Sequence, residues 1–329
     1  MPMVVIGLIG IGFLPTIDPS MKLLAAETQL AVEEDDRVIA VTRGGKVVLV
    51  YNKVSPPVPP QIDPVFQRSG FLHPVFSPRG KVVTDVFPAD HPHQQGIFSA
   101  WVRTRWRDRK VDFWNVARGT GQVTHERVVS TFQDESKAGF KVQLIHRALH
   151  PPKTDILRET WKVIVRPSEE DVHCFDLEST QENLTESPLI IDEYHYGGFA
   201  VRGPMSWLDP KDPGWTEELG SQSGSRFLND LGSDRQAGNH QRARWVSMYS
   251  RDSNRMATIT MLCHPSNRGA PQAARLHPTK PYFCFAACVD GEFTIEPEDP
   301  LRSRYRYLVT DKPPDPSWLH RRYESYAKE

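Results

Sequence analysis

Two imidazoles and a carboxylate stand within four residues in the stretch Asp90-His91-Pro92-His93, and two glutamine amides follow directly. Neutral imidazole transfers protons near neutral pH and binds transition metals, so this stretch favours acid–base chemistry or a metal site. Pro92 fixes φ and removes a backbone donor, which keeps the segment out of a helix. In an extended chain residues i and i+2 share a face, so His91 and His93 would point into one cavity. The alternative is an ordinary polar loop whose histidines hydrogen-bond to the backbone.

A second group of titratable residues is Asp192-Glu193-Tyr194-His195-Tyr196, which is followed by two glycines. On a strand, Glu193 and His195 would share one face, and the other three side chains would share the opposite face. A carboxylate beside an imidazole is the usual orienting pair for an acid, a base or a metal ligand. The residues predicted to be catalytic are His91, His93, Glu193 and His195.

Further polar and aromatic residues could contact a substrate. The stretch from Cys263 to Asn267 reads as a strand that runs into a turn, and its Pro-Ser-Asn sequence is ordinary turn chemistry. Indole rings stack on sugar faces, but they also fill the cores of β-sandwiches, so any single tryptophan is more often a core residue. The residues predicted to bind substrate are Arg68, His73, Trp101, Trp114, Arg202, His264 and Asn267.

The composition indicates which elements position these residues. In the 329 residues, 40 Lys and Arg balance 41 Asp and Glu, and no basic stripe of the kind that tracks nucleic acid is present. The 28 prolines and 21 glycines are scattered between short apolar runs, which is typical of many strands and turns. No helical stripe of three or more turns is found before Ser317. We therefore predict an all-β fold, a large antiparallel β-sandwich, with residues 27–312 as a single domain and 313–329 as a C-terminal tail.

Two segments have a more specific prediction. Residues 36–51 should form a hairpin that turns at a Gly-Gly pair, and residues 209–240, rich in Gly, Ser, Asp and Asn, should form a long loop of the kind that often binds ligands. Free, buried thiols are the expected state of the cysteines, since none stands in a CxxC pair. These are Cys174, Cys263, Cys284 and Cys288.

The N-terminus allows two interpretations. Residues 4–14 have the length of a signal-peptide core, and small residues before position 27 would suit a cleavage site, so residues 1–26 are a possible signal peptide or a disordered N-terminus. No Lys or Arg precedes the apolar run, and Met21 offers an alternative start. We favour export to the periplasm or the exterior over the cytoplasm. No later stretch has the length of a membrane span, so integral membrane association is not expected.

Four motifs, taken in order, resemble the PmoA-like family of bacterial proteins, a family essentially without assigned function. They are residues 68–78, the His91/His93 loop, residues 193–198 and residues 264–267. The resemblance covers about residues 30–312. The chain departs from the family pattern at Gln94, where the family usually has a second histidine, and at Cys263, where it has an aspartate.

Residues 293–310 more loosely resemble the last strands of galactose-mutarotase-like supersandwich proteins. This resemblance implies a two-sheet β fold whose concave face binds carbohydrate, with histidines and a carboxylate on that face. Aldose epimerases of that kind carry a base glutamate on a late strand, and the corresponding run 282–286 has none. Simple mutarotation by a His/Glu pair is therefore not expected.

The main functional hypothesis is a carbohydrate-active enzyme, a hydrolase, lyase or epimerase, that uses His/Glu acid–base chemistry in a concave cleft on a sugar or modified glycoside. One alternative is a non-catalytic carbohydrate-binding module that uses the same face. The other is a metal-dependent enzyme in which His91, His93 and His195 hold a divalent metal. The expected partner is a small carbohydrate or an oligosaccharide, with no nucleic acid; the sequence specifies no cofactor beyond that possible metal.

Overall fold

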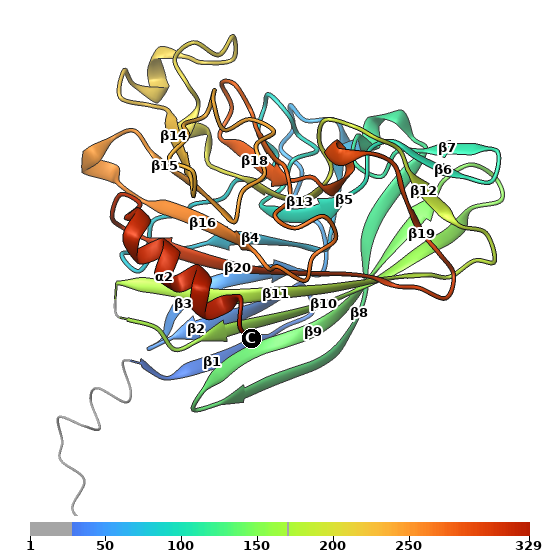
Figure 1. Ribbon diagram of the computed structural model, residues 1–329, viewed down its shortest axis with the longest axis horizontal. Helices are drawn as coiled ribbons and strands as arrows, with labels where there is room; N and C mark the ends of the chain where they lie inside the picture. The colour runs from blue at the N-terminus through green and yellow to red at the C-terminus, as the bar shows by residue number, and fades with distance from the viewer. Residues whose placement is uncertain (1–27, 170) are drawn as a thin grey trace, which may run out of the picture.

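The computed structural model describes residues 28–169 and 171–329, so the possible signal peptide at residues 1–26 lies outside the described residues. Every strand pairing in the described chain is antiparallel. Two large sheets and one small sheet make up nearly all of its regular structure (Figure 1). The predicted all-β antiparallel sandwich is therefore confirmed.

Sheet 1 has the order β1-β2-β3-β4-β5-β13-β18-β17. Its strands are β1 Leu30–Glu34, β2 Val38–Arg43, β3 Lys46–Asn52, β4 Phe71–Val75, β5 Ile97–Ala100, β13 Gly198–Arg202, β17 Ala274–Leu276 and β18 Tyr282–Phe285. The hairpin of β2 and β3 turns at Gly44 and Gly45, as the sequence predicts.

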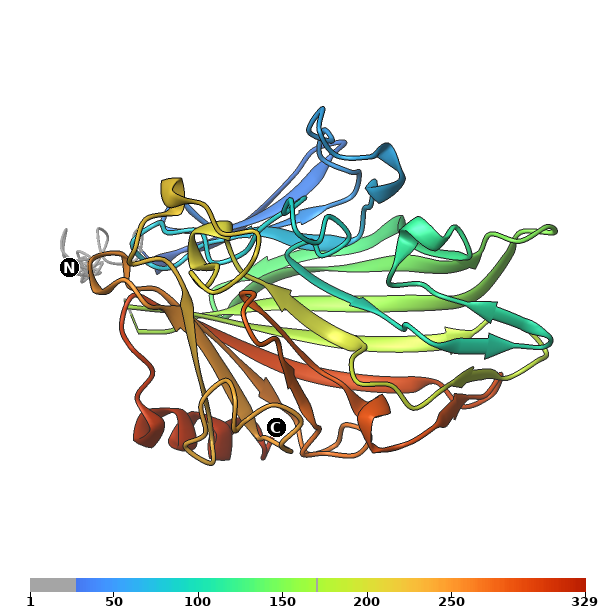
Figure 2. The same cartoon turned by 90° about the horizontal axis from the view of Figure 1, so that it is seen from above.

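Sheet 2 has the order β14-β15-β16-β20-β11-β10-β9-β8 and appears in Figure 2 as one curved layer in which β8 to β11 and β20 lie side by side. Its strands are β8 Gly121–Asp134, β9 Lys137–Ala148, β10 Thr154–Arg166, β11 Val172–Asn183, β14 Ser225–Asn229, β15 Trp245–Ser250, β16 Thr258–Cys263 and β20 Leu301–Thr310. The register of β8 on β9 shifts twice, between His125 and Arg127 and between Val128 and Ser130.

Sheet 3 is small, in the order β19-β12-β6-β7. Its strands are β6 Thr104–Trp106, β7 Arg109–Val111, β12 Leu189–Ile191 and β19 Phe293–Ile295. Single 3₁₀ turns interrupt the connections: η1 Pro64–Phe66, η2 Val116–Arg118, η3 Met205–Trp207, η4 Glu217–Leu219, η5 Ser253–Arg255 and η6 Ala287–Asp290.

Alternation along the strands of sheet 1 separates its two faces. Phe199 on β13 and Phe285 on β18 point toward sheet 2, where their ring centroids lie 5.0 and 6.0 Å from that of Tyr305 on β20. Burying such a ring stabilises the fold by about 1.5–3 kcal/mol. Arg202 and Tyr282, which pair across β13 and β18, project from the opposite face, and long connections cover them.

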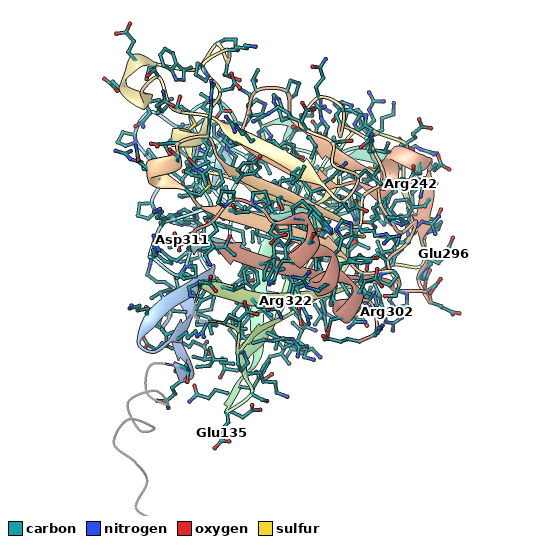
Figure 3. All side chains as sticks on the ribbon, turned by 60° about the vertical axis from the view of Figure 1, so that its left-hand side comes forward. Glu135, Arg242, Glu296, Arg302, Asp311 and Arg322 are labelled. Atoms are coloured by element: carbon teal, nitrogen blue, oxygen red, sulfur yellow. The ribbon has the colours of Figure 1, made fainter. Side chains whose placement is uncertain are left out.

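The helix α2, Pro316–Tyr326, lies over the outer face of sheet 2 (Figure 1). Asp315 caps its N-terminus by accepting a hydrogen bond from the Trp318 N–H at 3.1 Å, and Pro316 occupies the first turn, where its missing N–H costs nothing. Leu319, Tyr323 and Tyr326 are buried against sheet 2. Figure 3 shows Arg322 on this helix, which forms an ion pair with Glu169. The helix predicted for the residues after Ser317 is confirmed.

The prediction for residues 209–240 needs a correction. That segment contains η4 and the edge strand β14, which pairs with β15 so that Phe227 faces Met248. The strand escaped sequence analysis because a single buried ring in a polar, glycine-rich segment gives too little alternation. The four cysteines are free, as expected. Among the described residues, no helix has the length and apolar character needed to cross a membrane.

Candidate functional site

The histidine loop and β13 meet on the outer face of sheet 1. β5 begins directly after the loop, and Ile97 pairs with Val201 near the end of β13. Gly96 joins the two: its N–H donates to the Asp85 carbonyl at 2.7 Å, and its own carbonyl accepts from the Arg202 N–H at 2.8 Å. The φ of Gly96 is 61°, and an added Cβ would lie 2.0 Å from a backbone oxygen. Only glycine fits this position.

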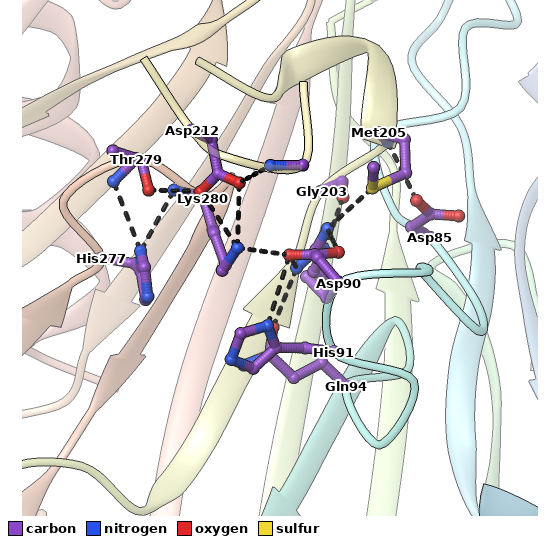
Figure 4. A network of polar contacts seen from close by, with 12 residues as sticks. Asp85, Asp90, His91, Gln94, Gly203, Met205, Asp212, His277, Thr279 and Lys280 are labelled. Carbon is purple, nitrogen blue, oxygen red and sulfur yellow. Dashed lines mark hydrogen bonds and ion pairs between the residues drawn. The ribbon is translucent and has the colours of Figure 1, made fainter. Parts of the chain in front are cut away.

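An ion network holds the loop in place (Figure 4). The Asp90 carboxylate accepts two hydrogen bonds from the fully buried Arg202, at 2.7 and 2.9 Å, and lies 3.1 Å from the ammonium of Lys280. Lys280 also donates to Asp212 at 3.0 Å. Burial opposes ionisation of Asp90, but the hydrogen bonds from His91 and Arg202 outweigh it and hold the pKa of this carboxyl well below its usual range. The long connection that carries Asp212 is thereby tied to the histidine loop.

Three imidazoles cluster beside this network. The ring of His91 has its centroid 5.4 Å from that of His93 and 6.0 Å from that of His277. His91 Nδ1 lies 3.4 Å from the Asp90 carboxylate, which favours a proton on Nδ1 and leaves Nε2 with a free lone pair. His277 Nδ1 instead accepts the N–H groups of Thr279 and Lys280, at 3.3 and 3.1 Å, which places its proton on Nε2. The arrangement therefore offers one basic nitrogen and one N–H donor.

Two of these imidazoles are held neutral. Burial lowers the pKa of His93 to about 3, and the positive charges of His91 and Arg202 act in the same direction. Burial also lowers the pKa of His277 to about 3, with help from Arg275 and Lys280. At neutral pH both rings are uncharged, which is the form that accepts or relays a proton.

These depressed pKa values predict an acid-sensitive fold. His93, His277 and His73, whose pKa burial lowers to about 4, all titrate below the 6.5 expected in the unfolded chain. The unfolded state thus binds more protons between pH 6.5 and about 4, so stability is full above pH 6.5 and falls with pH by about 1.36 kcal/mol per unit for each extra proton bound. We expect the melting temperature to be level above pH 7 and to drop steeply below pH 6.5, as followed by circular dichroism. A level melting temperature down to pH 4 would contradict this.

Aromatic rings continue from this cluster across the outer face. The rings of His277 and Tyr282 lie 6.3 Å apart, those of Tyr282 and Trp114 6.0 Å, and those of Trp114 and Tyr196 5.3 Å. Trp114 is fully buried and serves as a floor rather than an exposed stacking surface. Trp101 is also buried, and its indole N–H donates to Gln181 on β11, inside the sandwich, at 2.8 Å.

The second predicted pair, Glu193 and His195, lies at the other end of the β5–β13 ladder, where Gly198 pairs with Ala100. Both side chains are exposed. The His195 ring lies 4.2 Å from that of Tyr194, and its carbonyl accepts a hydrogen bond from His240 at 3.0 Å. A ladder of four residues spans about 10 Å, so the structure places this pair apart from the three-imidazole cluster.

The other residues predicted to bind substrate lie in other parts of the fold, where they contact neighbouring protein groups. Arg68 is buried, with one N–H donated to the Ser99 carbonyl at 2.8 Å and its guanidinium over the Phe98 ring. His73 shares a hydrogen bond with Thr84 at 3.0 Å. His264 contacts the ring of Tyr326 on α2, at 5.0 Å, and thus lies on the outer face of sheet 2; Asn267 bonds to the backbone of Arg304 there.

The described residues do not show the geometry of the metal site that was one of the alternatives from the sequence. No group of three or more His, Cys, Asp or Glu side chains among residues 28–169 and 171–329 is arranged to hold a metal ion, so His91, His93 and His195 form no such group. We therefore base no step on a metal.

Sequence analysis missed three residues of the cluster and its network: Asp212, His277 and Lys280. Asp212 lies in the segment that was predicted to be a binding loop, which was a usable signal. His277 and Lys280 belong to a His-Pro-Thr-Lys turn, which shares the His-Pro pair with the Asp90 loop. Only the adjacency of β17, β18 and β13 brings this turn to the site.

Comparison with known proteins places the chain in a family. The model of a family of unknown function, DUF6807, matches residues 38–324, most of the chain. The chain belongs to this family. The comparison does not show the PmoA-like resemblance that the four motifs suggested, and no curated protein matches this DUF6807 sequence.

Three solved structures that match this chain share little sequence with it. The alpha-N-acetylgalactosaminidase NagBb from Bifidobacterium bifidum is 12% identical, with 71% of this chain and 34% of that chain covered and a TM-score of 0.36. The heparan sulfate lyase HepC from Pedobacter heparinus is 9% identical, with 88% and 36% covered and a TM-score of 0.37. Slr1438 from Synechocystis sp. PCC 6803 is 12% identical, with 93% and 100% covered and a TM-score of 0.35. The DUF6807 chain covers about a third of the length of the two enzymes, and likeness at this level does not transfer their activities.

Proposed function

We propose that this protein is a carbohydrate-active enzyme that removes a proton from a sugar carbon and then either returns one to that carbon, as an epimerase does, or expels the neighbouring oxygen substituent, which takes up a proton, as a lyase does. The observation that carries the proposal is the pairing of His91 with His277. Their rings lie 6.0 Å apart, and their contacts leave a lone pair on Nε2 of His91 and a proton on Nε2 of His277. A base and a donor on neighbouring rings are what proton abstraction beside a carbonyl or carboxyl group requires.

Asp90 supports the role of His91 as the base. A carboxylate that contacts Nδ1 fixes the ring orientation and stabilises the imidazolium that forms when Nε2 takes a proton. Arg202 and Lys280 hold this carboxylate in position, so it orients the ring without taking the proton itself. His93 is neutral beside His91, because burial lowers its pKa to about 3, so its ring adds no positive charge next to the base.

The geometry favours proton transfer over glycoside hydrolysis. Hydrolysis generally uses two carboxyl groups about 5–9.5 Å apart, one of which must be available as an acid. Asp90 and Asp212 are committed to ion pairs with Lys280, and the third carboxyl group of this network, Asp85, accepts the N–H groups of Val86 and Met205. Glu193, the carboxylate predicted from sequence, is exposed at the far end of the ladder.

Two observations support a sugar as the substrate. Half-buried tyrosines at 194 and 196 lie 4.9 Å apart, and Tyr196 contacts Trp114; tyrosines of this kind suit a ligand with one apolar and one polar side. The resemblance of the closing strands to galactose-mutarotase-like proteins points the same way.

Deuterium incorporation tests this without knowledge of the substrate. We expect that incubation with a panel of sugars and uronates in D₂O exchanges one carbon-bound proton, seen as loss of its NMR signal. Replacing His91 or His277 by Ala should slow this about 10²–10⁴-fold, because a positioned acid or base contributes that much. His150→Ala, at an exposed histidine outside the site, is the control. Wild-type protein that binds sugars but exchanges no proton would favour a binding module instead.

A further inference from the structure

A recess opens at the end of the β5–β13 ladder where Glu193 and His195 lie. It lies between the β6–β7 hairpin, the start of β8 and Asp192, and has a volume of ≈ 450 Å³. This is within the range of small-molecule sites, which is about 300–1,000 Å³. The charged residues that line it are Arg103, Lys110, Asp112, Arg118 and Asp192.

Both carboxylates in the recess are already engaged. Asp112 accepts the N–H groups of Trp114 and Asn115, at 3.0 and 2.8 Å, and forms an ion pair with Arg118 at 3.1 Å. Asp192 accepts from Arg105 at 2.7 Å. Neither carboxylate has a free charge with which to hold a cation.

Two cations in the recess have no such partner. Arg103 is exposed and lies over the Tyr194 ring, with its guanidinium carbon 4.3 Å from the ring centroid. Lys110 is exposed on β7, and within the described chain neither side chain has a carboxylate contact. Thr120 accepts the N–H of Asp112 at 2.9 Å, which leaves its hydroxyl proton free to donate into the recess. The free groups are therefore all donors, two of them positively charged.

We propose that this recess binds the carboxylate or sulfate group of an acidic saccharide. Arginine and lysine bind such oxyanions through charge-assisted hydrogen bonds. That the ligand is a saccharide rests on the proposed function. The recess joins the three-imidazole cluster through neighbouring rings: Arg103 lies on Tyr194, Tyr194 lies 4.9 Å from Tyr196, and Tyr196 contacts the Trp114 floor. An acidic saccharide would place a charged unit here.

Calorimetric titration of the full chain tests this. The probes are a tetrasaccharide that contains glucuronate, its carboxyl-reduced form, a sulfated tetrasaccharide without uronate, and sodium sulfate. We expect an acidic tetrasaccharide to bind, the reduced form to bind at least about tenfold more weakly, and affinity to fall with added salt. Arg103→Met and Lys110→Met should each weaken binding about tenfold. Lys141→Met, at an exposed lysine on β9, should leave it unchanged.

Three results would overturn the proposal: no acidic tetrasaccharide binds at millimolar concentration, the reduced form binds equally well, or the Arg103→Met/Lys110→Met double variant keeps full affinity while its melting temperature matches wild type. Sodium sulfate that binds as tightly as the tetrasaccharides would show a site for free anions and overturn the saccharide assignment. His91→Ala separates the two proposals, because it should keep binding at the recess while deuterium exchange is lost. If no sugar exchanges a proton but the cation variants still weaken binding, the proposed function fails and the recess stands.

Discussion

Replacing Asp90 by Asn should lower the free energy of unfolding by about 3–5 kcal/mol, the usual cost of removing one partner from a buried ion pair. Asparagine keeps an acceptor for Arg202 but supplies no charge, so a fully buried guanidinium loses its counter-ion. Lys280 keeps Asp212 and suffers less. The size of this effect reflects the cost of leaving Arg202 buried without a counter-ion, and not the net stabilisation that the intact ion pair contributes.

Urea unfolding of wild type, Asp90→Asn and Asp299→Asn measures the effect. Asp299 is exposed, and its substitution should change the midpoint little. We expect a lower midpoint with an unchanged slope for Asp90→Asn. A midpoint within experimental error of wild type would mean that Arg202 does not depend on Asp90.

The second large loss of stability is expected when a buried carboxylate on sheet 2 is replaced. Glu159 on β10 is fully buried and accepts hydrogen bonds from His146 at 2.8 Å and from Ser179 at 2.6 Å. Burial opposes its ionisation, but the hydrogen bond and charge of His146 lower the pKa of this carboxyl. Glu159→Gln removes the charge and leaves polar groups in the core without matched partners. We expect a loss of about 3–5 kcal/mol in the free energy of unfolding.

A matched apolar variant separates packing from pairing. The triple variant His146→Phe, Glu159→Leu, Ser179→Ala removes the three hydrogen-bonding side chains of this trio together, and buried ion pairs replaced in this manner often cost little. We expect it to unfold at higher urea than Glu159→Gln. If the triple variant is the less stable one, the trio contributes a net stabilisation that exceeds its desolvation cost.

Local patterns in the sequence were enough to predict the fold class. Alternation and glycine turns set the β2–β3 hairpin and the sandwich, and the apolar spacing after Ser317 set α2. The strand β14 lies outside this prediction, because Phe227 and Leu228 stand side by side in a polar segment and give no alternation.

From the sequence, only those site residues that stand close together in the chain could be predicted to lie together. His91 and His93 share the cluster because only Pro92 separates them. His277 joins them through the order β13-β18-β17, a set of long-range pairings that no local pattern encodes. The same antiparallel pairing of β5 with β13 moves His195 to the other end of the ladder. Burial of Trp114 under the loops likewise depends on how distant segments pack.

The two register shifts in β8 bear on how molecules of this protein behave at high concentration. β8 is the outermost strand of sheet 2, and a long, regular outer strand offers unpaired N–H and C=O groups on which the same strand of another molecule can add. Bulges of the kind seen after His125 and Val128 increase local twist and interrupt that pattern of groups. Exposed charges at Glu126 and Arg127 stand at the first shift. The protein thus carries its own protection against edge-to-edge aggregation where sheet 2 ends.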